Sequence, residues 1–313
     1  METPVRLQPM TRARLSRLGD AGAAWTAALP DLLDRLADRW GLVWGRGLPG
    51  GSASYVVAAR RGEEDLVVKV PTPDLPEDVR TGEARVLAAA AGRGYAVLHA
   101  SDEASGALLM ERLGTSLDRS GRSPLEQARV LAGVLAQAWA VKAPGAAAVD
   151  KGASLATLVR RLDAAHPGAA DPGAVRLALE LAGRRSAARG EVPRVLCHGD
   201  PHPSNTLRVR SDRSGAPSGW VLVDPDGFLE DPAYDLGVVL RDFSSHLHGP
   251  DAADLLRGWC AEVAGPAGVD ADRVWEWAFL ERVSTGLYVT SFGAPAVGRP
   301  LLETAANLAR LLG

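Results

Sequence analysis

The chain has 313 residues, of which 46% are hydrophobic, and a formal net charge of −3. A chain of this length can bury a sizeable core and suits two lobes, and its scattered Lys and Arg residues argue against nucleic acid or a membrane surface as a partner. Charge-free stretches such as residues 130–141 are too short to span a bilayer, and the N-terminus lacks an apolar signal core. We therefore expect a cytoplasmic protein, with Cys197 and Cys260 as buried thiols rather than a disulfide.

A helix is predicted over residues 30–40. Its apolar residues recur at helical spacing and are followed by Gly41 as a stop signal; they are Leu29, Leu32, Leu33, Leu36 and Trp40. Residues 1–28 are rich in Arg, Ala and Gly and have no clear pattern. We assign residues 1–41 to an N-terminal helical extension that precedes the first sheet.

Short apolar runs predict a small antiparallel sheet. The runs are residues 42–44, 55–59, 66–70, 96–100 and 107–112, with a helix over 76–91 between the third and the fourth. The first turn contains Gly50, Gly51 and Ser52, whose backbone N–H groups and hydroxyl could lie against a phosphate. An ordinary hairpin turn has the same sequence requirements, because the segment matches neither G-x-G-x-x-G nor the P-loop pattern.

Lys69 lies inside the apolar run LVVKV, where an ammonium group is costly unless it is paired or lies at a cleft. Glu83 is on the inward face of the following helix, one turn before Leu87. A carboxylate on an inward face requires a cation, so we predict an ion pair between Lys69 and Glu83. The alternative is that each side chain reaches solvent alone. A strand lysine followed by a helix glutamate is the order in which kinases hold the lysine that contacts the α and β phosphates.

The second half of the chain is mainly helical in pattern. A capping box of Ser123 and Glu126 opens one helix. Further helices are predicted over residues 154–166, opened by Ser154, and over residues 171–189. The remainder beyond the segment described next is also predicted to be helical.

The most informative segment is VLCHGDPHPSNTLRV, residues 195–209, followed by WVLVDPDG, residues 220–227. In each, polar side chains follow a short apolar run, so that a strand would present Asp200, Asn205 and Asp224 at the edge of a cleft. Phosphoryl transfer to a hydroxyl needs a carboxylate near the nucleophile, Mg²⁺ and positive charge on the triphosphate. We interpret Asp200 as the catalytic residue and Asn205 and Asp224 as Mg²⁺ ligands.

Two other chemistries are conceivable at this segment. His198 and His202 stand at i and i+4 beside Cys197, but a zinc site with that spacing needs a helix, and Gly199 and Pro201 argue against one. A nucleophilic dyad of Cys197 and His198 is disfavoured because adjacent strand residues point to opposite faces. We expect Cys197 in the core and His198 to support the loop by hydrogen bonding.

The motifs HGDPHPSN and DPDGFLEDPAYDLG, together with Lys69 and Glu83 upstream, resemble the aminoglycoside phosphotransferase family, in particular its branch of streptomycin 6-kinases and hydroxyurea kinases. The resemblance spans almost the whole chain. Two departures stand out: the branch often has Lys where Asp226 stands, and often Leu and Gly where Pro201 and Ser204 stand. An acid near the metal site could shift ion preference or acceptor choice.

The resemblance implies an α+β, bilobal, protein kinase-like fold. A small N-terminal lobe with an antiparallel sheet would cover residues 42–113, and a larger, mainly helical C-terminal lobe residues 114–313. ATP and Mg²⁺ are the implied cofactors. The implied nucleotide-binding residues are Lys69, Glu83, Gly50, Gly51, Ser52 and, in the linker between the lobes, Met110, Glu111 and Leu113.

The resemblance also suggests roles for residues around the catalytic loop. His198 and Asp235 would support the loop, Asp235 through backbone hydrogen bonds. A cationic acceptor is expected to meet acids of the C-terminal lobe, and the candidates are Glu230, Asp231, Glu262 and Glu281. For Asp231, capping of the following helix is an equal alternative.

We therefore expect an ATP- and Mg²⁺-dependent kinase that phosphorylates a hydroxyl of an aminoglycoside, with streptomycin as the first choice, acting as a monomer or homodimer on a small-molecule acceptor. An alternative in the same class is a kinase of another small metabolite, such as hydroxyurea or an amino sugar. An alternative of another class is a non-catalytic, nucleotide-binding pseudokinase, although such proteins usually lack a base or a metal ligand, and both are present here.

Overall fold

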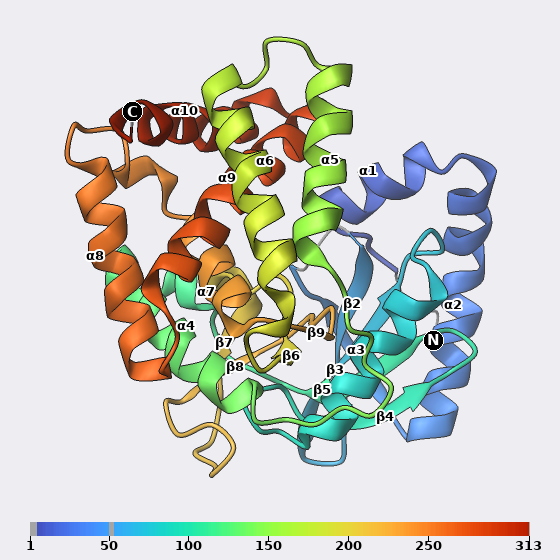
Figure 1. Ribbon diagram of the computed structural model, residues 1–313. Helices are drawn as coiled ribbons and strands as arrows, with labels where there is room; N and C mark the ends of the chain where they lie inside the picture. The colour runs from blue at the N-terminus through green and yellow to red at the C-terminus, as the bar shows by residue number, and fades with distance from the viewer. Residues whose placement is uncertain (1–4, 50–52, 313) are drawn as a thin grey trace.

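The structure of the protein, a computed structural model, describes residues 5–49 and 53–312. Its N-terminal part contains an antiparallel sheet in the order β1-β2-β3-β5-β4 (Figure 1). The strands are β1 (Val43–Gly47), β2 (Ser54–Arg61), β3 (Glu64–Pro71), β4 (Leu98–Asp102) and β5 (Ala107–Glu111). This sheet confirms the one predicted from the apolar runs. The turn that carries Gly50, Gly51 and Ser52 lies outside the described residues, so its phosphate contact stays a prediction.

The helix before the sheet is longer than predicted. α2 (Asp20–Trp40) begins at Asp20 rather than at residue 30 and passes through Pro30, and α1 (Pro9–Arg17) precedes it. The sequence pattern missed the first turns because alanine favours a helix but adds little apolar periodicity. Pro30 destabilises the helix, but Leu29 and Leu33 on either side are buried against the sheet and offset that cost.

Helix α1 fastens the N-terminal extension to strand β2. The Thr11 hydroxyl donates to the carbonyl oxygen of Ser54 at 3.0 Å, and the Gln8 amide donates to that of Val56 at 3.0 Å. An ion pair of 2.7 Å joins Arg14 to Asp74 beyond strand β3. The extension therefore holds the start of β2.

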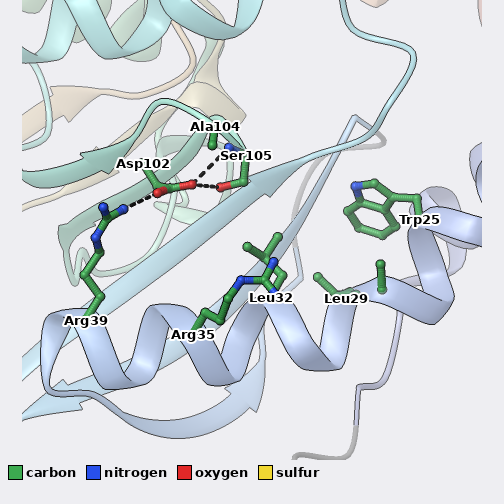
Figure 2. A pocket seen from close by; sticks show the side chains of 9 residues that line it. Trp25, Leu29, Leu32, Arg35, Arg39, Asp102, Ala104 and Ser105 are labelled. Atoms are coloured by element: carbon green, nitrogen blue, oxygen red, sulfur yellow. Dashed lines mark hydrogen bonds and ion pairs between the residues drawn. The ribbon is translucent and has the colours of Figure 1, made fainter.

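A hollow of about 470 Å³ lies between α2 and the turn that joins β4 to β5. Figure 2 shows its apolar floor, with Trp25, Leu29 and Leu32 on α2, and the ion pair of Arg39 with Asp102 at one side. These residues come from the surface helix and a hairpin tip, and none of the predicted site residues lines the hollow.

The C-terminal part is mainly helical, with α9 at its centre (Figure 1). Its helices are α4 (Pro124–Ala138), α5 (Lys151–Ala165), α6 (Pro172–Ala187), α7 (Pro232–Arg241), α8 (Ala252–Ala264), α9 (Ala271–Ser291) and α10 (Pro295–Leu311). The capping box at Ser123 is present as predicted. Helix α5, however, begins at Lys151 instead of Ser154, because the Asp150 carboxylate accepts from the Ala153 N–H and caps it.

Helix α3 (Glu77–Ala90) connects the two parts of the molecule. It follows β3 in the chain, yet its buried Val86 and Leu87 belong to the same apolar cluster as the C-terminal helices. A second apolar cluster lies between the sheet and α2. The molecule is therefore a bilobal α+β structure in which α3 is packed from both sides. Within residues 5–49 and 53–312, no helix combines the length and the apolar character needed to cross a membrane.

Candidate active site

Two short hairpin-like pairs build the predicted catalytic segment. β6 (Val195–Cys197) pairs with β9 (Phe228–Glu230), and β7 (Thr206–Arg208) pairs with β8 (Trp220–Leu222). The outer pair of strands encloses the inner one. This nesting brings the loop after β6, which carries Asp200, next to the loop after β8, which carries Asp224.

The loop with Asp200 is braced from helix α7. The Asp235 carboxylate accepts hydrogen bonds from the backbone N–H of His198 at 2.8 Å and of Gly199 at 3.0 Å, and from the indole of Trp139 at 2.9 Å. Burial raises the pKa of Asp235, and these donors oppose the shift by stabilising its ionised form. The His198 ring bonds the Val223 carbonyl oxygen at 2.8 Å, which ties the Asp200 loop to the Asp224 loop.

Lys69 joins the sheet to the helical part. Its Nζ lies 2.6 Å from Glu83 Oε2 and 2.8 Å from Asp224 Oδ1, so the predicted ion pair is present together with a third member. Burial disfavours the ammonium, but the carboxylates of Asp224 and Glu83 raise the pKa of Lys69 above its ordinary value. Burial also raises the pKa of Glu83, whose Oε1 is buried and has no hydrogen-bond partner among the residues that the structure describes. Lys69 is therefore charged and lies at the junction of the sheet and the helical part.

The donor set for a divalent cation lies where β7 meets β8. Asn205 Nδ2 donates to the Asp200 carbonyl oxygen at 3.2 Å, and this leaves its Oδ1 without a partner in the described part of the chain. The Asp224 carboxylate is 39% exposed, and its backbone has a positive φ of 60°, a strained conformation for a residue other than glycine. One amide oxygen and one carboxylate suit Mg²⁺, which retains several water and phosphate ligands. The residues present therefore fit the predicted metal.

Asp226 lies directly over the catalytic loop. Gly199 has a φ of 99°, and a side chain there would meet the Asp226 carboxylate at 2.5 Å, so only glycine fits beneath this acid. The Asp226 side chain reaches solvent although protein surrounds it on most sides, and burial raises its pKa. The Lys151 ammonium opposes this rise in the pKa of Asp226, and it lies over the Phe228 ring at 4.6 Å from the ring centroid. The site thus contains a cation at the start of α5 that the sequence did not reveal.

Arg241, at the end of α7, is the main residue that sequence reasoning missed. Its Nη2 lies 2.8 Å from Asp200 Oδ1, its Nε lies 3.0 Å from Asp242 Oδ1, and its Nη1 lies 3.6 Å from Glu281 Oε2. Burial opposes the ionised form of Asp200, but Arg241 nevertheless holds its pKa below the ordinary value. A signal was present: Arg241 ends the apolar run LGVVL, and a cation on a buried helix needs a carboxylate nearby.

The four acids proposed for acceptor binding separate into different environments. Glu230 is buried and accepts from the backbone N–H of Lys151 and Asp231. Asp231 is buried, caps α7 and pairs with Arg273, so the capping alternative describes it. Both acids are buried and are engaged with groups of the protein itself.

Glu262 and Glu281 differ from each other in their burial and in their partners. Glu262 pairs with Arg129 on the exposed side of α8, a helix that Figure 1 places away from β6 and β9. Glu281 is buried, accepts from the Tyr234 hydroxyl at 2.8 Å and lies beside Arg241. Of the four acids, Glu281 alone is linked to Asp200, and the link runs through Arg241.

The linker segment begins at the end of β5. Met110 is buried in that strand, opposite Val67 of β3, and Leu113 is buried in a small cluster with β8. The Glu111 carboxylate accepts from the backbone N–H of Val97 at 2.8 Å and pairs with Arg213 at 2.6 Å. The Glu111 side chain is therefore structural, and any adenine contact of this segment is left to its backbone.

Neither alternative chemistry gains support. Among the described residues, no group of three or more His, Cys, Asp or Glu side chains is arranged to hold a metal ion. Cys197 is fully buried, its thiol donates to backbone carbonyl groups at the end of β9, and burial raises its pKa far above the ordinary value. Such a thiol is not a nucleophile.

The site combines a buried lysine held by a helix glutamate, a loop that carries a carboxylate, and an amide–carboxylate pair between the two. On a bilobal α+β fold, this combination defines a kinase-type phosphotransferase site. Residues 44–272 match the model of the phosphotransferase enzyme family. The chain belongs to this family and is an ATP-dependent phosphotransferase that acts on hydroxyl groups.

Characterised relatives match over nearly the whole chain. A streptomycin 6-kinase of Streptomyces glaucescens is 26% identical over 293 residues, which are 93% of this chain and 92% of the relative. A hydroxyurea phosphotransferase of Kitasatospora aureofaciens is 28% identical over 284 residues, which are 89% of this chain and 78% of the relative.

Solved structures match at the level of the fold. An aminoglycoside phosphotransferase crystallised with ADP and hygromycin B gives a TM-score of 0.60 at 12% identity, covering 89% of this chain and 97% of the other. The choline kinase of Streptococcus pneumoniae gives 0.59 at 14% identity, with coverages of 89% and 98%. The bilobal kinase-like fold implied by the motifs is confirmed.

Proposed function

We propose that the protein transfers the γ-phosphate of ATP to a hydroxyl of an aminoglycoside, with streptomycin as the first acceptor to test. The proposal rests on one observation: Lys69, Asp200 and Asp224 come from distant parts of the chain and lie in one accessible site. The two streptomycin 6-kinases among the relatives support the acceptor.

Each residue has a separate role in the proposed phosphoryl transfer. Lys69 supplies positive charge to the triphosphate and is oriented by Glu83. Asn205 Oδ1 and Asp224 would hold Mg²⁺, which neutralises charge on the phosphate oxygens. Asp200, kept ionised by Arg241, accepts a hydrogen bond from the acceptor hydroxyl, orients it for in-line attack and receives its proton.

We also propose the lobe boundary at Leu113, with residues 42–113 as the nucleotide-binding lobe and residues 114–313 as the lobe that carries Asp200. The linker of Met110, Glu111 and Leu113 would then hold adenine through backbone groups. His198 and Asp235 serve as supports of the Asp200 loop in this scheme, because each is bonded to that loop's backbone or to its neighbour.

The proposal is tested by ADP release with Mg·ATP and a panel of streptomycin, deoxystreptamine aminoglycosides, amino sugars and hydroxyurea. Asp200→Asn should lower kcat on the true acceptor by about 10²–10⁴-fold, since proton transfer and orientation at such a site contribute that much. A matched control is Asp163→Asn, an acid of α5 that lines a hollow together with residues of α6 and α10. Turnover by Asp200→Asn within tenfold of the wild type would remove Asp200 from catalysis.

A second candidate acceptor is hydroxyurea, because a relative of similar identity is a hydroxyurea phosphotransferase. Cells that express the protein should tolerate streptomycin if the first proposal holds and hydroxyurea if the second does. Binding of Mg·ATP without transfer to any acceptor of the panel would favour a pseudokinase instead.

A further inference from the structure

Helix α9 carries one face that begins at the catalytic site and ends in solvent. Glu281 and Thr285 lie beside Arg241, whose Nη1 donates to the Thr285 hydroxyl at 3.3 Å. Tyr288 and Phe292 follow at positions three and seven beyond Thr285, so the helical repeat places all four side chains on one side of the helix. Exposure rises along this face, from the buried Glu281 to 46% at Tyr288 and 56% at Phe292.

Tyr288 and Phe292 form a pair of rings that are about half exposed. Their centroids are 4.6 Å apart and their planes meet at 72°, so the rings pack edge to face. Single exposed apolar residues are common on protein surfaces, but two aromatic side chains that fix each other's orientation form a preorganised platform. The platform begins one helical turn from Thr285, and its far ring lies about 10 Å along the axis.

The charges at the catalytic end of this face favour a cationic ligand. Arg241 contacts three carboxylates, those of Asp200, Asp242 and Glu281, and the His202 ring, which is positive only when protonated, lies 3.6 Å from Asp200. One positive and three negative charges leave the group with a net charge of −2. The faces of aromatic rings also attract cations. Both ends of the α9 face therefore favour binding of a positively charged group.

We propose that Tyr288 and Phe292 are a specificity-determining part of the acceptor site, and that they bind an amine or guanidinium group of the acceptor whose hydroxyl reacts at Asp200. This inference rests on the proposed function. It requires an acceptor long enough to place a cationic group on the rings, which lie beyond Arg241 and Thr285 as seen from Asp200. Streptomycin-like cationic glycosides meet the requirement, and hydroxyurea, which is small and neutral, does not.

The test measures whether the two rings affect binding of the acceptor without affecting binding of ATP. Tyr288→Leu, Phe292→Leu and the double variant are compared with the wild type for the KM of streptomycin and the KM of ATP. Each single change should raise the streptomycin KM by about five- to thirtyfold, the range of a cation–π contact that is partly desolvated, and leave the ATP KM unchanged. Tyr288→Phe retains a ring and should keep most of the affinity. Val297→Ala on α10, another exposed apolar residue, is the matched control and should change neither constant.

Each outcome has a distinct meaning. A streptomycin KM within twofold of the wild type in the double variant overturns the inference while the proposed function stands. Turnover of hydroxyurea but not of any cationic glycoside overturns the inference together with the aminoglycoside proposal, and leaves hydroxyurea as the acceptor. No turnover of any acceptor by the wild type, with no binding of streptomycin by calorimetry, overturns both. Light scattering that finds a dimer in the wild type and a monomer in Phe292→Leu assigns the rings to self-association and also overturns it.

Discussion

Lys69 and Arg241 are two nearly buried cations that each hold a carboxylate of the site, yet they are anchored differently. Lys69, on the sheet, reaches Asp224 across 155 positions of sequence and so bridges the two lobes. Arg241 and Asp200 belong to the same lobe, and Thr285 of α9 supports the arginine from behind. The first contact depends on how the lobes meet, whereas the second is built into one packed unit.

The difference assigns them different tasks. Asp224 is also the carboxylate proposed to hold Mg²⁺, so its contact with Lys69 has to be exchangeable. A compact ammonium on a flexible stem suits such an exchange. Asp200 needs one fixed orientation, and the planar guanidinium of Arg241, held by Asp242 and Glu281 as well, provides it. The site therefore combines one movable cation with one fixed cation.

Replacing the movable cation should have the largest effect. Lys69→Met is expected to lower kcat/KM by about 10²–10³-fold, the usual loss on removing one charged donor from developing phosphate charge. Steady-state kinetics with Mg·ATP and the accepted substrate measure it. Lys142→Met, at an exposed position of the C-terminal lobe, is the control and should be silent. Equal activity of the two variants would contradict the role given to Lys69.

Replacing the fixed cation should act mainly on stability. Arg241→Met leaves Asp200, Asp242 and Glu281 facing one another without a counter-charge, and breaking a buried pair in this way costs about 3–5 kcal/mol of unfolding free energy. Urea denaturation measures the loss, and Arg241→Lys should recover part of it.

The control for this prediction is Arg257→Met on α8. That arginine is exposed and pairs with the exposed Asp254, so its removal should cost less than about 0.5 kcal/mol. If Arg241→Met were as stable as Arg257→Met, the arginine would not be a structural anchor, and Asp200 would need another source of orientation.

The same contrast shows what sequence could predict. Lys69 and Glu83 were found because each violates a local apolar pattern, and Asp200, Asn205 and Asp224 because they follow short strands in a recognisable order. The fold class followed from the same motifs. Arg241 was missed although it ends the apolar run LGVVL, because a basic residue is ordinary at a helix end and its partners Asp200 and Glu281 come from distant segments.

The surroundings of the candidate acids depend on tertiary contacts, which the sequence pattern did not predict. Glu230 and Glu262 are both acids of the C-terminal lobe, but one is buried under the start of α5 and the other pairs at the surface of α8. No local pattern separates them. The nesting of β6–β9 around β7–β8 was likewise beyond reach, because three-residue strands have too little pattern to specify a partner.

The smallest effect should come from the outermost partner of the fixed cation. Asp242 is 31% exposed, against 5% for Glu281, so solvent screens much of its attraction to Arg241. Asp242→Asn should cost about 0.5–1 kcal/mol in urea denaturation, with the loss shrinking in high salt, and Asp254→Asn on α8 should cost nothing measurable. Because Arg241 retains Asp200 and Glu281, kcat should fall no more than a fewfold. A loss in the Asp242 variant as large as in Arg241→Met would mean that the guanidinium is held from its exposed side, and the distinction between a fixed and a movable cation would fail.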